Sequence, residues 1–213
     1  MQTLQQRRPI PRTSVSQACE KLVRDRVLAQ SVVDFWTQEL TPDDWYAGGD
    51  ALDDMCVQRF GSLLQDLHEG RLEDWLADPK TIFGYILLAD QLSRNIHRGS
   101  GRAFETDAKA RAAAKKAIGH GWDLRIEPPA RQFFYLPLEH SECLEDQDRA
   151  VRLILERLPD GASTLLHARA HREIIRRFGR FPTRNVALGR RSFEEEQQFL
   201  ETGGYGRVLR ELQ

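Results

Sequence analysis

Apolar residues recur along this chain every three or four positions, which is the period of an amphipathic α-helix. Between residues 50 and 70 they fall at Leu52, Met55, Cys56, Phe60, Leu63, Leu64 and Leu67. No stretch alternates convincingly between apolar and polar residues at the period of two that a half-buried strand requires. The pattern therefore predicts an all-α protein of about seven to nine helices.

Capping residues, prolines and glycines predict where these helices begin and end. The predicted starts lie at Asp50, Asp78-Pro79, Pro128-Pro129, Ser141, and Ser192 with Glu195 as a capping box. Pro137 is expected to end the short helix that Pro128-Pro129 begins, because proline breaks a helix interior. The predicted ends are Gly70, Gly119 and Gly179.

The length and composition fit one compact helical domain. The chain has 213 residues, of which 40% are hydrophobic and 30% are charged. We expect a flexible tail over residues 1–13 and a single domain over residues 14–213. No apolar run reaches the roughly 18 residues of a membrane span, and no signal peptide is recognised, so we expect a cytoplasmic protein with no membrane partner.

Charge narrows the classes of partner. The net charge of −1 argues against a protein whose whole surface binds nucleic acid. Five of the 31 basic residues are lysines, so 26 are arginines, which offer a bidentate fork to carboxylates and phosphates. Arginine-rich codon usage is the simpler explanation of the overall bias, so the local placement of each arginine has to decide.

Polar residues fall on the apolar faces of three predicted helices. Asp90 and Arg94 continue the four-residue spacing of Ile82 and Ile86, so they share the inward face of their helix. By the same reasoning Gln147 and His171 point inward from the two later helices. Since burying such groups unpaired costs several kcal/mol each, we expect them to meet one another or a ligand. A satisfied network between helices is the structural alternative.

His140 and Glu142 lie in the bend between two predicted helices, next to Pro137. Together with His171, and with His167 one turn earlier, they form a candidate set of two histidines and a carboxylate for a metal. The three cysteines, Cys19, Cys56 and Cys143, are far apart and form no zinc-binding pair. No phosphate loop or dinucleotide fingerprint is present either, so we expect neither a metal nor a cofactor.

Two similar turns stand ninety residues apart. Each has Arg-Asn, a glycine four residues after the Asn, and a Phe-Glu pair: Asn95, Gly99 and Phe104-Glu105 in the first, and Asn185, Gly189 and Phe193-Glu194 in the second. The turns are expected to end helices whose inner faces line one basin, with left-handed backbone at the Asn and Gly positions. The arginines around that basin would favour an anion: Arg94, Arg98, Arg180, Arg184 and Arg190.

Four motifs in this order resemble the bacterial domain-of-unknown-function family 924. They are VVDFW from Val32, DQLSRNIHRG from Asp90, FFYLPLEHSECLEDQ from Phe133 and RFGRFPTRNVALGR from Arg177, and the match covers about residues 32–199. The resemblance implies an all-helical fold similar to that of tetratricopeptide-repeat proteins, in which helical hairpins pack against one another. It also implies an intracellular bacterial source. It implies no particular activity.

The resemblance also carries a polar signature onto this chain. It comprises Asp90, Gln91, Arg94, Asn95, Arg98, His140, Glu142, Gln147, His171, Arg180, Arg184, Asn185 and Arg190. This chain departs from the family at Thr183, where the family has histidine, and at Leu92-Ser93, where it has Phe-Pro. The loss of that histidine further reduces the case for a metal.

These observations favour a small-molecule-binding protein, with enzymatic activity as an open question. His171 or His140 would act as general acid or base, Glu142 or Asp90 would orient it, and the arginines would hold a carboxylated or phosphorylated ligand. The first alternative is an interaction module for an acidic peptide or protein, and the second is an RNA-contacting protein that uses the basic run of residues 169–191. The anion hypothesis requires Asp90 and Arg94 to lie within hydrogen-bond reach of Arg184 and Asn185, with His171 nearby.

Overall fold

The computed structural model describes residues 12–213. These residues form eleven α-helices and no strand, as the helical period of the sequence predicts. The helices are α1 Arg12–Asp34, α2 Asp44–Ala47, α3 Asp50–His68, α4 Ile82–Ile86, α5 Ser93–Ile96, α6 Asp107–Gly119, α7 Leu136–Glu139, α8 Leu144–Arg157, α9 Ala162–Phe178, α10 Glu194–Glu201 and α11 Gly204–Leu212. The predicted all-α class is confirmed.

Shorter helical segments connect them. Five are 3-10 helices, Glu73–Ala77, Gly101–Phe104, Asp123–Arg125, Ala130–Phe134 and Pro182–Arg184, and two are π-helical, Phe35–Glu39 and Leu87–Leu92. Because the second π-helical segment joins α4 directly to α5, the three form one continuous helix over residues 82–96. Seven α-helices of eight residues or more, together with this composite helix, make eight in the described residues, within the predicted range.

Several predicted starts are displaced by one to three residues. The residue that caps α3 is Gly49, and Asp50 is already helical. The composite helix begins at Ile82 rather than at Pro79, since residues 78–81 form a turn closed by the Thr81 N–H on the Asp78 carbonyl. Helix α8 begins after Cys143, where the Ser141 hydroxyl accepts from the Cys143 N–H. The helices lie where the sequence predicts them, but the residues that cap them are not the predicted ones.

Two local predictions are wrong. Pro137 does not end a helix but occupies the first turn of α7, where its missing N–H costs no hydrogen bond. The capping box of α10 uses Glu196 instead of Glu195, since its carboxylate accepts from the Phe193 N–H at 2.8 Å. The predicted tail of residues 1–13 lies outside the described residues up to residue 11, and Arg12 and Thr13 belong to α1.

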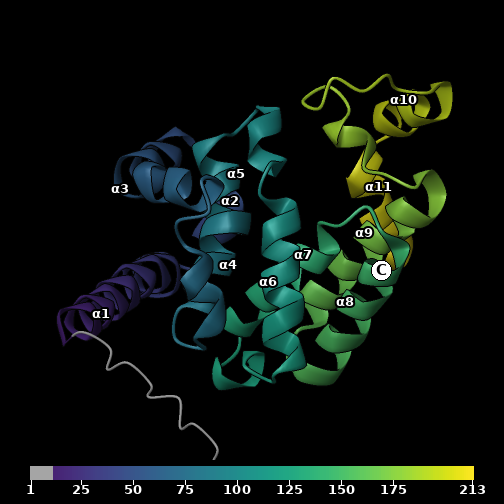
Figure 1. Cartoon of the computed structure of the whole chain (residues 1–213). Coiled ribbons are helices and arrows are strands. Elements are labelled where there is room, and N and C mark those ends of the chain that lie inside the picture. The colour runs from purple at the N-terminus through teal and green to yellow at the C-terminus, as the bar shows by residue number, and fades with distance from the viewer. Residues whose placement is uncertain (1–11) are drawn as a thin grey trace, which may run out of the picture.

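The helices pack mainly against their neighbours along the chain. Contacts join α1 with α4, α3 with α5, α4 with α6, α6 with α7, α7 with α8, α8 with α9 and α9 with α11. In Figure 1 the colour accordingly runs from purple α1 and blue α3 on one side, through α4 and teal α6, to green and yellow α8 to α11 on the other. The tetratricopeptide-like character that the resemblance implies stays a prediction.

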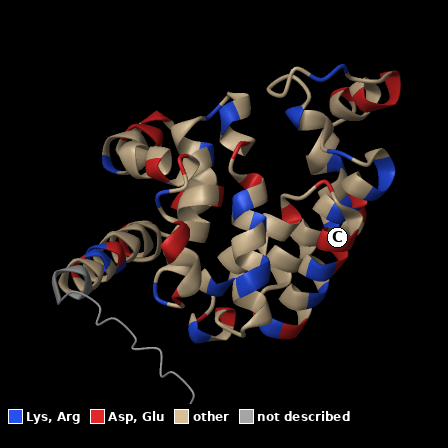
Figure 2. Ribbon diagram, in the orientation of Figure 1, with Lys and Arg blue, Asp and Glu red and all other residues tan. Residues whose placement is uncertain are grey.

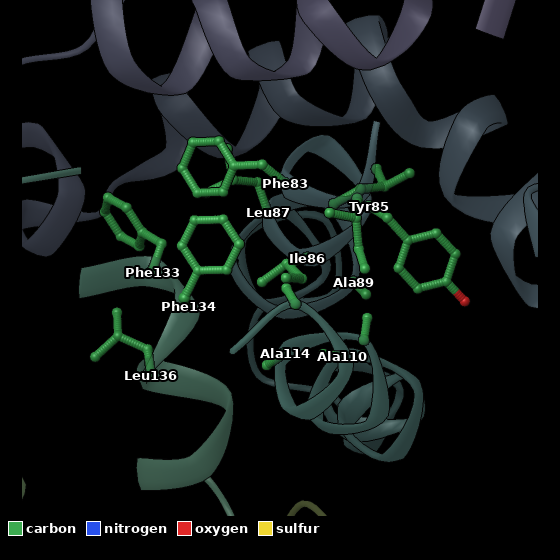
Figure 3. Packing of buried hydrophobic residues seen from close by; sticks show 14 of the residues in the cluster. Phe83, Tyr85, Ile86, Leu87, Ala89, Ala110, Ala114, Phe133, Phe134 and Leu136 are labelled. Atoms are coloured by element: carbon green, nitrogen blue, oxygen red, sulfur yellow. The ribbon is translucent and has the colours of Figure 1, made fainter. Parts of the chain in front are cut away.

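The main core surrounds α4. The Phe83 ring of α4 stacks on the Phe134 ring, with ring centroids 4.8 Å apart. Figure 3 shows both rings between α4 and the Phe133–Leu136 segment. Helix α6 presents small residues to the same helix, including Ala110 and Ala114, which are fully buried. These small side chains let α6 approach α4 closely, so that the composite helix is enclosed from several sides.

A second, smaller cluster lies at the C-terminal end of the chain. It contains Ala170, Ile174, Ile175, Phe181, Phe199 and Val208, with Tyr205 packed against it. This cluster holds the turn after α9 against α10 and α11. No helix of residues 12–213 has both the length and the apolar character that a membrane span needs.

Two glycines in helix interiors provide a test of this packing. A Cβ added at Gly84 would lie 2.7 Å from the Ala29 carbonyl oxygen, where α1 crosses α4, whereas a Cβ at Gly61 in α3 has nothing within 4 Å. Gly84→Ala should therefore destabilise the protein by about 1–3 kcal/mol. Gly61→Ala should stabilise it by about 0.5–1 kcal/mol, because alanine has the better helix propensity. Urea unfolding of both variants measures this, and an equal effect of the two substitutions would contradict the close crossing.

Candidate functional site

A cavity of about 740 Å³ opens between the two hydrophobic clusters. It is lined by residues of α2, the composite helix, α7, α9, the turn at residues 181–184, α10 and α11. Its apolar walls include Trp45, Leu136, Ile174, Phe181 and Phe199. Its polar side chains are Tyr46, Gln91, Arg94, Gln132, Glu139, His140, Ser163, Thr164, His167, His171, Thr183, Arg184 and Tyr205.

The π-helical turn of the composite helix positions Asp90. Residues 87–92 form this turn and are all buried; Asp90 is 0% exposed, and Gln91 beside it lines the cavity. Such π-helical turns occur frequently at functional sites. The Gln91 side-chain amide donates to the Asp90 carboxylate at 2.6 Å. The sequence pattern placed Asp90 inward, and the wider turn allows its neighbour to reach the same site.

His140, at the end of α7, faces Asp90. Its Nδ1 lies 2.8 Å from Oδ1 and 3.0 Å from Oδ2 of Asp90, so the Nδ1–H donates to the carboxylate. Burial opposes ionisation of Asp90, but the charge of Arg94, the charge that His140 carries when it is protonated at low pH, and the hydrogen bonds of His140 and Gln91 outweigh it, so the pKa of Asp90 lies well below its usual range. Burial and the charge of Arg94 lower the pKa of His140 despite Asp90. The neutral imidazole therefore keeps an unprotonated Nε2.

Arg94 and Arg184 meet at a shared carboxylate, Asp107. Arg94 Nη2 lies 2.9 Å from Asp107 Oδ1, although the two are not aligned for a hydrogen bond, and Arg184 Nη1 donates to Asp107 Oδ2 at 3.2 Å. Arg94 also pairs with Asp90 at 3.1 Å. The guanidinium of Arg184 lies 4.6 Å from the ring centroids of both Phe104 and Phe181. The expected contact between Asp90 and the Arg184 turn is thus indirect and passes through Arg94 and Asp107.

Glu139, the residue before His140, is a second buried carboxyl group, and its protonation state differs from that of Asp90. Its side chain is 1% exposed, and neither carboxylate oxygen has a hydrogen-bond partner among the described residues. Burial, and then the charge of Asp90, raise the pKa of Glu139 to about 8. One buried carboxyl group of the site is therefore ionised at neutral pH and the other is protonated.

His171 lies across the cavity from His140, with ring centroids 6.1 Å apart. Its Nδ1–H donates to the His167 carbonyl at 2.9 Å and lies 3.7 Å from Glu139 Oε2. Burial, followed by the charge of His140, lowers the pKa of His171 to about 3. His171 is therefore neutral near pH 7, and its Nε2 can accept a hydrogen bond.

The segments that follow the two Arg-Asn motifs approach each other at Gly101 and Ala187. A Cβ at Gly101 would lie 2.5 Å from the Ala187 carbonyl oxygen, so only glycine permits this approach. Gly99 and Gly189 have φ of 78° and 62°, in the left-handed region. Asn185 is instead right-handed, contrary to the expectation for the Asn positions, and donates from its amide to Ser192 and Glu196.

The structure separates the predicted site residues into two groups. Six gather at the cavity, five of them on its lining and Asp90 behind His140: Asp90, Gln91, Arg94, His140, His171 and Arg184. Seven do not line it: Asn95, Arg98, Glu142, Gln147, Arg180, Asn185 and Arg190.

Members of the second group mostly have protein partners. Arg98 pairs with Asp53, and Arg180 pairs with Glu196. Arg190 forms a bidentate pair with Glu142, whose carboxylate also accepts from the Phe181 N–H at 2.8 Å. The roles expected for these residues, in catalysis for Glu142 and in ligand binding for the arginines, receive no support from this geometry.

Sequence reasoning missed Glu139, Asp107, Tyr46, Gln132 and Tyr205. Glu139 was missed because Pro137 was interpreted as the end of a helix and not as the start of α7. The side-chain amide of Gln147 donates to the carbonyls of Glu139 and Ser141 at 2.5 Å and 2.7 Å, which holds the C-terminal end of α7 in place. Once α7 is recognised as a helix that begins at Pro137, its buried face carries Glu139. The sequence signal that could have revealed α7 was Pro137, because proline is favoured in the first turn of a helix.

No group of three or more His, Cys, Asp and Glu side chains in the described part of the chain is arranged to hold a metal ion. The candidate set of His140, Glu142 and His171 is not assembled, since Glu142 is held by Arg190. The site can instead supply a base at His140, a proton at Glu139 and donors at Arg94 and Arg184.

The raised pKa of Glu139 makes a prediction about stability. Between the unfolded pKa of about 4.3 and the folded pKa of about 8, the folded state keeps a proton that the unfolded state has released. Stability should therefore fall with rising pH across this window, by at most about 1.4 kcal/mol per pH unit, and level off above pH 8. Glu139→Gln should remove this contribution, so its advantage over the unmodified chain grows with pH. Urea unfolding from pH 4 to pH 9 measures it, and a pH-independent difference would contradict the assignment.

Comparison with known proteins gives the chain its family. Residues 32–204 match the family described as "Bacterial protein of unknown function (DUF924)". A solved structure, that of the protein of unknown function ATU0120 from Agrobacterium tumefaciens, is similar with a TM-score of 0.77 and 39% sequence identity, over 83% of this chain and 98% of that one. No curated protein matches. The resemblance seen in the four sequence motifs is thus confirmed, and the chain belongs to the DUF924 family of bacterial proteins.

Proposed function

We propose that this protein binds a small anionic molecule in the cavity and carries out acid–base chemistry on it. The observation that carries the proposal is the Asp90–His140 pair, whose hydrogen bonds of 2.8 Å and 3.0 Å fix the imidazole at the edge of a cavity of about 740 Å³. Cavities of about 300–1,000 Å³ with apolar walls and a few converging polar groups are typical of small-molecule sites.

His140 has the properties of a general base. An ionised carboxylate that accepts from Nδ1–H fixes the tautomer and leaves the Nε2 lone pair for a substrate. Since burial lowers the pKa of His140, the base is unprotonated at neutral pH. Glu139, with a pKa of about 8, retains its proton there and can return one to a leaving group or an enolate. Two groups with opposite proton occupancy thus share one cavity.

Arg94 and Arg184 are the anion-binding groups. They share Asp107, and burial followed by the charge of Arg94 lowers the pKa of Arg184, which means that its positive charge is incompletely compensated. Among the described residues only Nη1 of Arg184 donates to a protein group, so its remaining N–H groups are available to a carboxylate or phosphate.

The alternatives have weaker support. An RNA-contacting role would use the basic run of residues 169–191, but six of its eight arginines pair with carboxylates: Arg172 with Asp148, Arg176 and Arg177 with Glu173, Arg180 with Glu196, Arg184 with Asp107 and Arg190 with Glu142. Blue and red segments are interspersed on the ribbon in Figure 2. An acidic-peptide module would use an open groove, whereas the charged residues here converge on a small cavity.

Arg184→Gln tests the proposal. Protein produced in its bacterial host and analysed by native mass spectrometry should carry a small anionic molecule, which Arg184→Gln should lose. Arg98→Gln is the matched control, because Arg98 pairs with Asp53 away from the cavity and should leave the bound molecule in place. Removing one charge-assisted contact should weaken binding by about tenfold or more.

The chemistry is tested on the molecule so identified. His140→Gln should retain binding but lower turnover by about 10² to 10⁴, the usual contribution of a general base. A bound molecule that survives in Arg184→Gln, or a chain that carries none, would refute the anion site. Turnover that is unchanged in His140→Gln would refute the assignment of the base.

A further inference from the structure

Glu139 holds a buried carboxyl group that the protein itself does not satisfy. Both oxygens are buried and without a hydrogen-bond partner among the described residues, and the residue lines the cavity. Its main chain is fixed, since Gln147 donates to its carbonyl at 2.5 Å. The side chain is therefore held at the cavity without a donor.

No group within residues 12–213 supplies that donor. Nδ1 of His171 lies 3.7 Å from Glu139 Oε2, but its proton is used by the His167 carbonyl at 2.9 Å. An unsatisfied buried polar group costs about 1–3 kcal/mol, and more when it is ionised. A core position gains nothing from such a carboxyl group, whereas a binding site gains a strong acceptor.

Two tyrosines of the cavity lie near Glu139. Trp45, Tyr46 and Tyr205 line the cavity, and Tyr46 and Tyr205 are close enough to Glu139 for its charge, after burial, to contribute to the raised pKa of both phenols. The Tyr46 hydroxyl donates to Gln132 at 2.8 Å, which fixes the ring at the cavity. Aromatic faces attract cations, most strongly where water is excluded.

We infer that the Glu139 end of the cavity binds a protonated amine of the ligand. The ammonium replaces the proton that Glu139 carries in the empty cavity, this proton is released to solvent, and the ammonium lies between the resulting carboxylate and the rings of Tyr46 and Tyr205. With an amine bound, Glu139 is the counter-ion and no longer the proton donor. A carboxylate with no donor of its own matches an ammonium group, which brings up to three donors and a compensating charge. If Arg94 and Arg184 hold an acidic group of the same ligand, that ligand is a small amino acid-like molecule with an apolar body. This second statement rests on the proposed function. The amine site itself is independent of the anion site.

A matched series of probes tests the two ends separately: 2-phenylethylamine, its neutral counterpart 2-phenylethanol, and 3-phenylpropanoate. Affinities for the full chain are measured by ligand-observed NMR at pH 7. We expect 2-phenylethylamine to bind about tenfold more tightly than 2-phenylethanol, and this preference to vanish in Glu139→Gln. Glu145→Gln, at an exposed carboxylate of α8, is the control and should retain it. Glu139→Asp, which keeps the carboxyl group, should retain part of it.

The outcomes distinguish this inference from the proposed function. Equal affinity for 2-phenylethylamine and 2-phenylethanol, or an amine preference that survives in Glu139→Gln, overturns the amine site whatever 3-phenylpropanoate does. Binding of 3-phenylpropanoate that depends on Arg184 but not on Glu139 belongs to the anion site alone. An amine preference without any carboxylate binding supports the amine site and contradicts the anion site. Absence of binding by every probe at millimolar concentration overturns both.

Discussion

The buried carboxylate of Asp90 is the constraint on which the rest of the site depends. An ionised group at 0% exposure is stable only with charged and hydrogen-bonded partners, and Asp90 obtains them from Arg94, His140 and Gln91. These partners come from the composite helix and from the end of α7. Arg94 then shares Asp107 with Arg184, which ties the start of α6 and the turn after α9 to the same centre.

Asp90 and Glu139 show how position decides the state of a carboxyl group. Both are buried, but the first has three partners and the second has none among the described residues. The charge of Asp90 also disfavours a second charge at Glu139, which contributes to its raised pKa. Pairs of groups whose environments separate their pKa values in this way are characteristic of acid–base sites. The proposed chemistry follows from that asymmetry.

Much of the fold and part of the site could be predicted from the sequence. Helical periodicity identified the helices, and the four-residue spacing from Ile82 to Arg94 placed Asp90 and Arg94 on one inward face. The same reasoning gave His171. It also placed Gln147 inward correctly, but the amide serves the main chain of α7 and not the cavity.

The rest depended on information that single-helix patterns do not carry. Periodicity assumes a regular α-helix, so the π-helical turn at residues 87–92 could not be anticipated. Treating Pro137 as a stop concealed α7, which directed attention to Glu142 instead of Glu139. Asp107 lies at the start of α6 and resembles any acidic residue of a first helical turn. Its role emerges only when tertiary packing brings Arg94 and Arg184 to it.

The central claim is that one cavity holds an ionised Asp90 and a protonated Glu139 at neutral pH. Carboxyl ¹³C NMR of the labelled chain, with Asp90→Asn and Glu139→Gln for assignment, measures both states in one titration. The account predicts that Asp90 stays ionised from pH 4 to pH 9 and that Glu139 titrates near pH 8. Titration of Glu139 near its ordinary pKa of about 4.3 would contradict the account.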